Sequence, residues 1–369
     1  MPEPLRVLQV LGSSAGGVAR HVRQVAQATS APAPQGPGWT VRVAAPAALA
    51  DVLTPPGGPV GFDAVEISDR PRRQDAEAAR RLRSLAAGAD VLHAHGLRAG
   101  ALAVVAARTL PPARRPRVVV TLHNLPVGGR SVRAVSAVLE QVVARGADVV
   151  LGVSGDLVDR ASRLGARVTE RALVPAPGRP PVARDPAAVR TSLGLEPGTA
   201  LVVTVARLAP QKGLDTLLGA AQSLARDGTA PVWVVAGDGP LHGPLAERIA
   251  AGALPVRLLG RRDDAADLLA AADVVVSSAV WEGQPLAIQE ALAVGAAVVA
   301  TDAGGTREVT ADAAVLVPVG DAAALAGAVR RLLDDPDARA DLRRRALARA
   351  ADLPDEAAVV DQLRRVYGA

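Results

Sequence analysis

Two glutamates, Glu282 and Glu290, are separated by seven residues in a stretch that is otherwise almost entirely apolar, WEGQPLAIQEALAVG (281–295). The glycine and proline after Glu282 predict a turn, and a helix is predicted to begin at Leu286. Glu282 would then precede the helix and Glu290 would lie about one turn into it, so that both can face one ligand. Carboxylates accept hydrogen bonds from paired hydroxyls, such as those of a sugar or a ribose. The alternative is one loop acid and one acid on the helix surface.

A pair of cations points to phosphate chemistry. Arg207 and Lys212 lie in RLAPQKG, directly after the apolar stretch 200–206, and Lys212 is the only lysine of the chain. Arginine can grip two phosphate oxygens, lysine supplies a mobile point charge, and the N-terminus of a following helix favours an anion. We therefore predict phosphate binding here rather than two solvated loop charges. The turn GDGPL follows the stretch 231–237, and its Gly237 is a weaker candidate for close approach to a ligand.

Two turns of the first half also carry small or polar residues. Gly16 and Gly17 begin a predicted helix after the first strand, where a diphosphate or a sugar can approach the backbone. His123 and Asn124 follow the apolar stretch 117–122, and His123 is the histidine that we expect to act in the site.

Other polar residues have plainer predicted roles. His95 also ends a strand and is expected to pack near the site, whereas His21 and His242 are expected to lie at the surface. Glu308 is as compatible with a helix start as with ligand contact. The one D-x-D sequence, at Asp335, follows a helix and is expected to cap the next one.

These candidates need elements that bring them together. Apolar runs of four to eight residues alternate with helical patterns along the whole chain. The predicted strands are 6–11, 40–45, 63–67, 90–95, 117–122, 148–153, 171–175, 200–206, 231–237, 256–260, 273–278, 296–301 and 314–318. Apolar strands between helices predict parallel sheets covered on both faces, and two such series predict two doubly wound α/β domains. Ligands of such sheets bind beyond the carboxyl ends of the strands, which is where the candidates lie.

The predicted domains are joined by the proline-rich segment VPAPGRPPVARDP (174–186), which cannot continue a helix or a central strand. We expect an N-terminal domain over 1–178 and a C-terminal domain over 179–352. A last helix within 353–369 is expected to pack back onto the N-terminal domain.

Composition excludes several classes of protein. There is no cysteine, so disulfides, thiolate metal sites and cysteine nucleophiles are excluded. Aromatic residues make up 1% of the chain, so the cores must consist of alanine, valine and leucine. No apolar run reaches the roughly 18 residues of a membrane-spanning helix, and the N-terminus lacks the features of a signal peptide, so we expect a cytoplasmic protein.

Charge is unevenly distributed along the chain. Residues 1–180 hold 23 arginines and 13 acidic residues, whereas acids outnumber bases in the rest. Two interpretations stay open: a solvated basic face, or contact with an anionic partner such as a membrane surface or an acidic acceptor. The second would make the protein peripheral to the inner face of a membrane, and no nucleic-acid partner is expected.

Taken in order, these segments resemble the retaining, nucleotide-sugar-dependent glycosyltransferases of family 4 over essentially the whole chain. The E-x7-E pattern, the following GG and Glu, the RLAPQKG and GDGPL segments and the N-terminal GG carry the resemblance. It implies the GT-B fold, in which two Rossmann-like domains face each other across a cleft. It also implies a role for each candidate residue.

The resemblance assigns the donor-binding residues as follows. Arg207 and Lys212 would bind the donor diphosphate, Glu290 the nucleotide ribose, and Glu282 the transferred sugar. His123 would contact that sugar near the reacting carbon. The remaining donor-binding residues would be Gly16, Gly17, Gly237, Arg261, Gly283, Gln284, Pro285 and Leu286, of which Gln284 and Pro285 replace a common F-G pair.

The implied reaction moves a hexose with retention from a UDP- or GDP-linked donor to an acceptor hydroxyl, as in polysaccharide biosynthesis. The acceptor would be lipid-linked or a cell-envelope glycan. No metal and no cofactor is expected, because the cations take the role of a metal. The alternatives are a UDP-sugar 2-epimerase-like isomerase, a pyridoxal-phosphate-dependent phosphorylase using Lys212, and a non-catalytic nucleotide-sugar binder.

Overall fold

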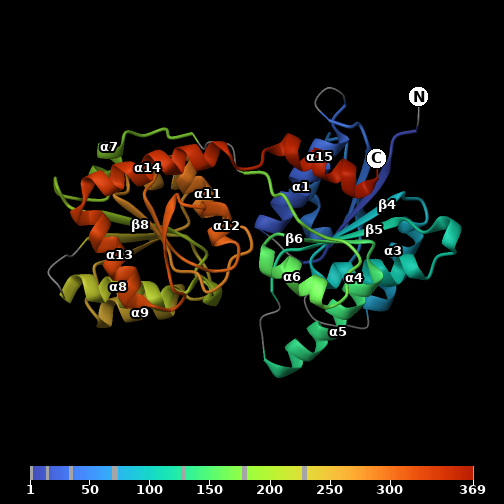
Figure 1. Ribbon diagram of the computed structural model, residues 1–369, viewed down its shortest axis with the longest axis horizontal. Helices are drawn as coiled ribbons and strands as arrows, with labels where there is room; N and C mark the ends of the chain where they lie inside the picture. Colours follow the sequence, from blue (N-terminus) through green and yellow to red (C-terminus); the bar gives the residue numbers. More distant parts are fainter. Residues whose placement is uncertain are drawn as a thin grey trace. The chain divides into compact units, whose positions relative to one another are not determined.

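The structure, a computed structural model, describes residues 3–13, 16–32, 36–68, 74–125, 129–176, 181–226 and 231–368. The chain divides into two units (Figure 1). The N-terminal unit comprises Met1–Pro175 and Pro354–Ala369, and the C-terminal unit comprises Ala176–Leu353.

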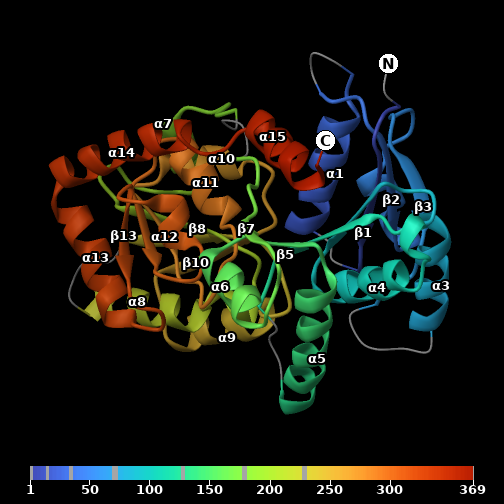
Figure 2. The same cartoon turned by 45° about the vertical axis from the view of Figure 1, so that its right-hand side comes forward.

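The N-terminal unit is built on a parallel sheet with the strand order β3-β2-β1-β4-β5-β6-β7. Its strands are β1 (Arg6–Leu11), β2 (Thr40–Ala45), β3 (Gly61–Ala64), β4 (Val91–His95), β5 (Arg117–Leu122), β6 (Val149–Gly152) and β7 (Thr169–Arg171). Its helices are α1 (Gly17–Ser30), α2 (Ala50–Leu53), α3 (Asp75–Ala86), α4 (Leu97–Arg108), α5 (Arg130–Gly146), α6 (Gly155–Arg163) and α15 (Glu356–Tyr367), with 3₁₀ turns η1 (Ala47–Leu49) and η2 (Pro112–Arg114). Figure 2 shows α1 and α15 on one face of this sheet and α3 and α4 on the other.

The C-terminal unit repeats the plan with the strand order β10-β9-β8-β11-β12-β13, again all parallel. Its strands are β8 (Leu201–Val205), β9 (Val232–Ala236), β10 (Val256–Gly260), β11 (Val274–Ser277), β12 (Val298–Thr301) and β13 (Ala314–Val317). Its helices are α7 (Pro186–Ser192), α8 (Leu214–Arg226), α9 (His242–Ala251), α10 (Ala265–Ala271), α11 (Leu286–Ala293), α12 (Thr306–Thr310), α13 (Ala322–Asp334) and α14 (Pro336–Ala351), with the turn η3 (Pro210–Lys212).

Alternation of side chains along the strands builds two apolar layers in the C-terminal unit. In β8, Val202 joins the layer under α8 and α13, whereas Leu201 and Val203 join the layer under α10, α11 and α14. Successive strand residues point to opposite faces, so a strand that is apolar throughout is buried on both sides. Trp233 fills the first layer without exposure, and its indole N–H donates to Thr204 Oγ1 over 3.1 Å.

The two doubly wound α/β units confirm the predicted fold class. Four strands have the predicted bounds, and six others differ by one residue at one or both ends. Three predictions were wrong by more: 296–301 is replaced by Val298–Thr301, 63–67 by Gly61–Ala64 and 171–175 by Thr169–Arg171. In the last two, pairing with the neighbouring strand begins earlier than the apolar run does, at Arg42↔Gly61 and at Val150↔Thr169.

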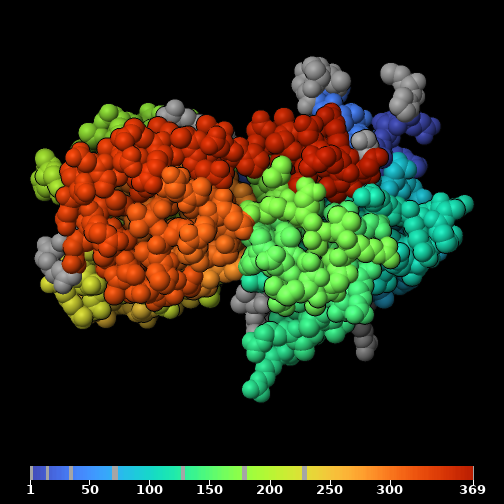
Figure 3. All heavy atoms as spheres, in the orientation of Figure 1, coloured from blue at the N-terminus to red at the C-terminus, as the bar shows by residue number. Residues whose placement is uncertain are grey.

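The last helix belongs to the N-terminal unit by its contacts. Gln362 accepts from the Leu173 N–H over 2.8 Å and donates to the Arg171 carbonyl over 2.6 Å, and Arg117 donates to the Val366 carbonyl. In Figure 3 the red atoms of this segment lie against atoms of the first half of the chain. Among the described residues, no helix is long and apolar enough to cross a membrane.

Candidate functional site

The centre of the C-terminal sheet is the point where the strand order reverses. β8 and β11 lie side by side there, and the chain continues from β8 toward β9 on one side and from β11 toward β12 on the other. Doubly wound sheets bind ligands in the crevice at this point, outside the carboxyl ends of the strands. The loop after β8 carries Arg207 and Lys212, and the loop after β11 carries Glu282.

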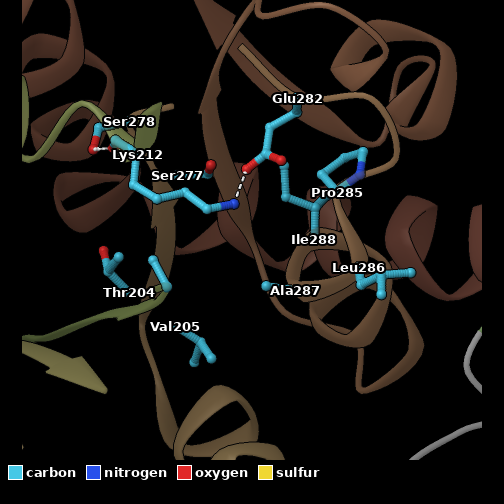
Figure 4. A pocket seen from close by; sticks show the side chains of 11 residues that line it. Thr204, Val205, Lys212, Ser277, Ser278, Glu282, Pro285, Leu286, Ala287 and Ile288 are labelled. Atoms are coloured by element: carbon cyan, nitrogen blue, oxygen red, sulfur yellow. Dashed lines mark hydrogen bonds and ion pairs between the residues drawn. The ribbon is translucent and has the colours of Figure 1, made fainter. Parts of the chain in front are cut away.

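Lys212 and Glu282 meet in this crevice. The Lys212 Nζ lies 2.5 Å from Glu282 Oε1, and the side chains are 23% and 14% exposed. Both line a small pocket whose other walls come from the end of β8, the end of β11 and the first turn of α11 (Figure 4). Its remaining lining residues are Thr204, Val205, Ala206, Ser277, Ser278, Pro285, Leu286, Ala287 and Ile288. A cation, a carboxylate, hydroxyls and free helix N–H groups together can recognise a phosphorylated, hydroxyl-bearing ligand.

The Lys212 loop is fastened to the loop after β11. The Ser278 hydroxyl donates to the Lys212 carbonyl over 2.9 Å, and the Val280 N–H donates to the Gln211 carbonyl over 2.9 Å. Gly213 has φ +59°, and a Cβ there would lie 2.0 Å from the Ser278 carbonyl oxygen. Only glycine permits this approach, so the local backbone fixes where the ammonium can reach.

The Glu282 loop is fastened in the same way to the turn after β12. The Gly305 N–H donates to the Glu282 carbonyl over 2.8 Å. Gly304 has φ +53°, and a Cβ there would lie 2.1 Å from the same carbonyl oxygen. The diglycine of TDAGGT thus lets two loops of the protein touch each other.

The GDGPL turn shows the same principle beside Arg207. A Cβ on Gly237 would lie 2.0 Å from the Ala206 carbonyl oxygen, and the Leu208 N–H donates to the Asp238 carbonyl over 3.0 Å. What approaches Gly237 is therefore the protein's own backbone. Arg207 itself is exposed and forms no ion pair with any residue that the structure describes.

Only some of the other predicted donor-binding residues of this unit line the Lys212 pocket. Pro285 and Leu286 line the Lys212 pocket, and Gly283 and Gln284 lie in the turn that leads to α11. Glu290 is half-buried further along α11, outside the set that lines the pocket. Arg261 follows β10, two strands away from β8, and its 89% exposed side chain lies 4.0 Å from Asp263. The structure therefore does not bring Arg261 to this pocket.

The D-x-D sequence is confirmed as a helix cap. The Asp335 carboxylate accepts from the Ala338 N–H over 2.9 Å at the start of α14.

The N-terminal sheet also has its reversal point at two adjacent central strands, β1 and β4. Gly16, with φ +80°, precedes α1, and Gly17 is the first residue of that helix; both are exposed. His95 ends β4, and His123 follows β5 and is half-buried. Asn124 and His95 line an open pocket of about 730 Å³, formed by this unit alone.

His21 corrects the sequence prediction. It lies on α1 but is only 6% exposed, because α1 turns this face toward the carboxyl ends of β4 and β5. Its ring is 5.8 Å from that of His95 and 5.5 Å from that of His123. Burial lowers the pKa of His21 to about 4. His242 is exposed at the start of α9, as predicted.

A buried chain of hydrogen bonds leads from His123 to the C-terminal helix. His95 Nδ1 lies 3.2 Å from His123 Nε2, and His95 Nε2 lies 2.7 Å from Gln9 Oε1. The Gln9 amide donates to the Tyr367 hydroxyl over 3.2 Å. The Tyr367 hydroxyl also lies 2.6 Å from His93 Nδ1, so the series of hydrogen bonds ends at His93.

One assignment of protons satisfies this chain. The Gln9 Oε1 accepts from His95 Nε2, which leaves His95 Nδ1 to accept from His123 Nε2. Burial and neighbouring histidines hold the pKa values of His95 and His123 well below the ordinary range, so both rings are neutral at pH 7. The sequence analysis missed Gln9, His93 and Tyr367. The spacing of His93 and His95, two residues apart on one strand face, was the available signal.

Known proteins resemble both halves of the chain. The family model "Glycosyltransferase Family 4" matches residues 15–180, and "Glycosyl transferases group 1" matches residues 187–349. The D-inositol 3-phosphate glycosyltransferase of Frankia alni is 32% identical over 71% of this chain and 70% of its own length. The alpha-D-kanosaminyltransferase of Streptomyces kanamyceticus is 31% identical over 45% of each chain, so the match spans less than half of that relative.

Among solved structures, HepE of Anabaena in complex with UDP superposes with a TM-score of 0.78 at 20% identity. The match covers 99% of this chain and all of that one. At this identity the likeness shows the fold, and it confirms the GT-B architecture.

Proposed function

Because the chain belongs to the glycosyltransferases of the group 1 and family 4 type, we propose that it transfers a sugar from a nucleoside diphosphate to an acceptor hydroxyl. The observation that carries the proposal is the Lys212–Glu282 pair at the reversal point of the C-terminal sheet.

In this proposal Lys212 and Arg207 bind the donor diphosphate. The lysine ammonium has three N–H donors, so it can donate to Glu282 and to a phosphate oxygen at the same time. Arg207, exposed in the same loop, can turn toward the same group. Negative charge grows on the diphosphate as the sugar leaves, and fixed cations stabilise that charge without a metal ion.

The carboxylates are binding groups in this proposal. Glu282 accepts from hydroxyls of the transferred sugar, beside the first turn of α11, and Glu290 accepts from the ribose. His123 contacts the sugar near the reacting carbon, and the neutral state of its ring suits hydrogen bonding to a hydroxyl. The sugar is transferred with retention, and the leaving diphosphate takes the proton of the acceptor hydroxyl.

For the substrates, we propose a UDP- or GDP-linked hexose and an anionic or lipid-linked acceptor. The UDP complex of HepE and the inositol phosphate in the name of the Frankia relative favour these classes. The open pocket beside His95 and Asn124 offers room for an acceptor. The arginine-rich first half suits an acceptor that carries phosphate, and it suits peripheral contact with an anionic membrane in the cytoplasm.

Removal of the single lysine tests the proposal. Lys212→Ala should lower kcat/KM for transfer by about 100-fold or more, as the loss of one stabilising donor does elsewhere. It should also reduce the thermal shift that UDP or GDP produces. The control is Arg331→Ala, which removes one exposed positive charge from α13 of the same unit. Full transfer activity in Lys212→Ala would refute the proposal, and release of free nucleoside diphosphate without a glycosylated acceptor would favour an isomerase.

A further inference from the structure

Three histidine nitrogens converge in the N-terminal unit. His21, His95 and His123 each offer one ring nitrogen, and these nitrogens lie within 4.8 Å of one another. The residues come from α1, the end of β4 and the turn after β5, so three separate elements fix their positions. His95 Nδ1 and His123 Nε2 are 3.2 Å apart, close to the separation of two nitrogens bound to one ion at about 2.0–2.1 Å.

His21 supplies an independent sign of a missing partner. Its side chain is 94% buried, and its Nδ1 has no hydrogen-bond partner among the described residues. Buried polar atoms normally have a partner, and one that lacks it is explained by strain, by a catalytic role, or by an absent water or ion.

The surroundings of His95 resemble the outer shell of a metal ligand. Its Nε2 donates to Gln9 Oε1 over 2.7 Å, and Gln9 is fully buried. Metal-binding histidines commonly donate their second ring N–H to such an acceptor, which fixes the tautomer and aims the other lone pair. Here Nδ1 of His95, the ring nitrogen that carries no proton, points toward His123.

We propose that His21, His95 and His123 form a binding site for one divalent transition-metal ion of the zinc type. Three neutral imidazoles suit Zn²⁺, Co²⁺, Ni²⁺ or Cu²⁺, whereas Mg²⁺ and Ca²⁺ require oxygen ligands. His123 moves its proton from Nε2 to Nδ1 so that Nε2 can coordinate, and no proton leaves the protein. The fourth position of the ion remains for a water or a substrate oxygen.

This site shares His123 with the proposed sugar contact and is otherwise separate from the proposed donor-binding residues. It contains residues of the N-terminal unit alone, and the diphosphate-binding cations lie in the C-terminal unit. Metal binding is therefore measurable whether or not the chain proves to be a glycosyltransferase.

Cobalt binding to the full, tag-free chain tests the site. Co²⁺ should produce one visible ligand-field band that saturates at one equivalent and that Zn²⁺, but not Mg²⁺, abolishes. His21→Gln should weaken Co²⁺ binding by at least about 100-fold, since even outer-shell changes cost 10–100-fold. The control His242→Gln, at the exposed histidine of α9, should bind as the unaltered chain does.

A second variant and one direct measurement keep the test decisive if His21→Gln fails to fold. His123→Gln alters the half-buried member of the trio, and X-ray absorption of the zinc-loaded chain should show three imidazoles at about 2.0–2.1 Å. The site is refuted if no saturable binding occurs up to about 1 mM Co²⁺, which corresponds to a weak affinity of about 4 kcal/mol. Equal weakening by His242→Gln would refute it as well.

Discussion

At the scale of single residues, the glycines of the C-terminal unit connect sequence to site. Gly213, Gly237 and Gly304 each lie where a Cβ would come within 2.1 Å of a carbonyl oxygen of another loop, which is too close for any side chain. The sequence around Glu282 therefore contains two kinds of residue. The polar residues carry the chemistry, and the glycines allow the loops that hold those residues to come into contact.

Gly304→Ala tests that contact. The alanine Cβ would lie 2.1 Å from the Glu282 carbonyl oxygen, so the loop that carries Glu282 must shift. The control is Gly320→Ala, at a φ of +81° with open space around the Cβ position among the described residues. Both variants should lose about 1–2 kcal/mol of unfolding free energy from the left-handed backbone. Gly304→Ala alone should also lose at least about tenfold in nucleoside diphosphate affinity, because a shift of one charged group by an ångström misplaces it. Equal affinities in the two variants, measured by calorimetry, would contradict the proposal that the contact at Gly304 positions the Glu282 loop.

At the scale of elements, apolar runs predicted most strands closely and failed at the two edges of the N-terminal sheet. β5, between two neighbours, has the predicted bounds, since its residues after Arg117 are all buried and, apart from Thr121, apolar. β3 and β7 lie at the edges, where pairing with one neighbour sets the bounds and the side chains need not be apolar. Ile67, the last residue of the predicted 63–67 strand, lies beyond β3 but is still buried, and its carbonyl accepts from the Ser13 N–H over 3.0 Å.

The sequence predicted those residues of the candidate site that lie in loops directly after strands. Lys212 and Glu282 follow two strands that a reader of the sequence can align at one sheet edge. The buried polar chain was not predictable, because it joins Gln9 to a tyrosine 358 residues away. Contact between the last helix and the first strand is a property of packing, and no local pattern encodes it. His21 was misjudged for the same reason, since a helix histidine looks exposed until its neighbours are known.

Tyr367 is therefore expected to position His123 through Gln9 and His95. Tyr367→Phe removes the acceptor of the Gln9 amide and the donor to His93. Leaving a buried donor unpaired should cost about 1–3 kcal/mol of unfolding free energy. We expect kcat for transfer to fall several-fold while the affinity for nucleoside diphosphate, measured by calorimetry, is unchanged.

The control for Tyr367→Phe is Thr29→Val on α1. Thr29 is fully buried and its hydroxyl donates to the Val25 carbonyl over 2.7 Å, outside the chain that reaches His123. It should lose stability with kcat intact. A kcat of Tyr367→Phe equal to that of Thr29→Val would show that the tyrosine acts on stability alone.

At the scale of the whole molecule, the histidines are divided unequally between the units. His21, His93, His95 and His123 lie in the N-terminal unit, and only the exposed His242 lies in the C-terminal unit. Burial is the first cause of the lowered pKa of each of the four, to about 4 for His21 and about 3 for His93. The two units should therefore respond differently to mild acid.

The change in unfolding free energy with pH depends on which state of the N-terminal unit binds more protons. An unfolded histidine binds a proton below about pH 6.5, whereas the folded His21 and His93 remain neutral down to about pH 4 and 3. Acid therefore favours the unfolded N-terminal unit. Its unfolding free energy should fall by about 1.4 kcal/mol per pH unit for each such histidine as the pH drops from about 6 to 4. Carboxylates contribute little in the upper part of this window because their ordinary pKa values are near 4.

Unfolding followed at pH 7 and pH 5 tests this difference. The unfolding transition of the N-terminal unit should move to lower temperature in calorimetry at pH 5, and that of the C-terminal unit should move less. In Trp39→Phe, tryptophan fluorescence reports the C-terminal unit alone, because the other tryptophans, Trp233 and Trp281, lie there. His21→Gln should reduce the acid sensitivity of the N-terminal unit and His242→Gln should not. Parallel shifts of both transitions would mean that the buried histidines do not control the response to acid, since the unit that holds them would then be no more sensitive than the unit that lacks them.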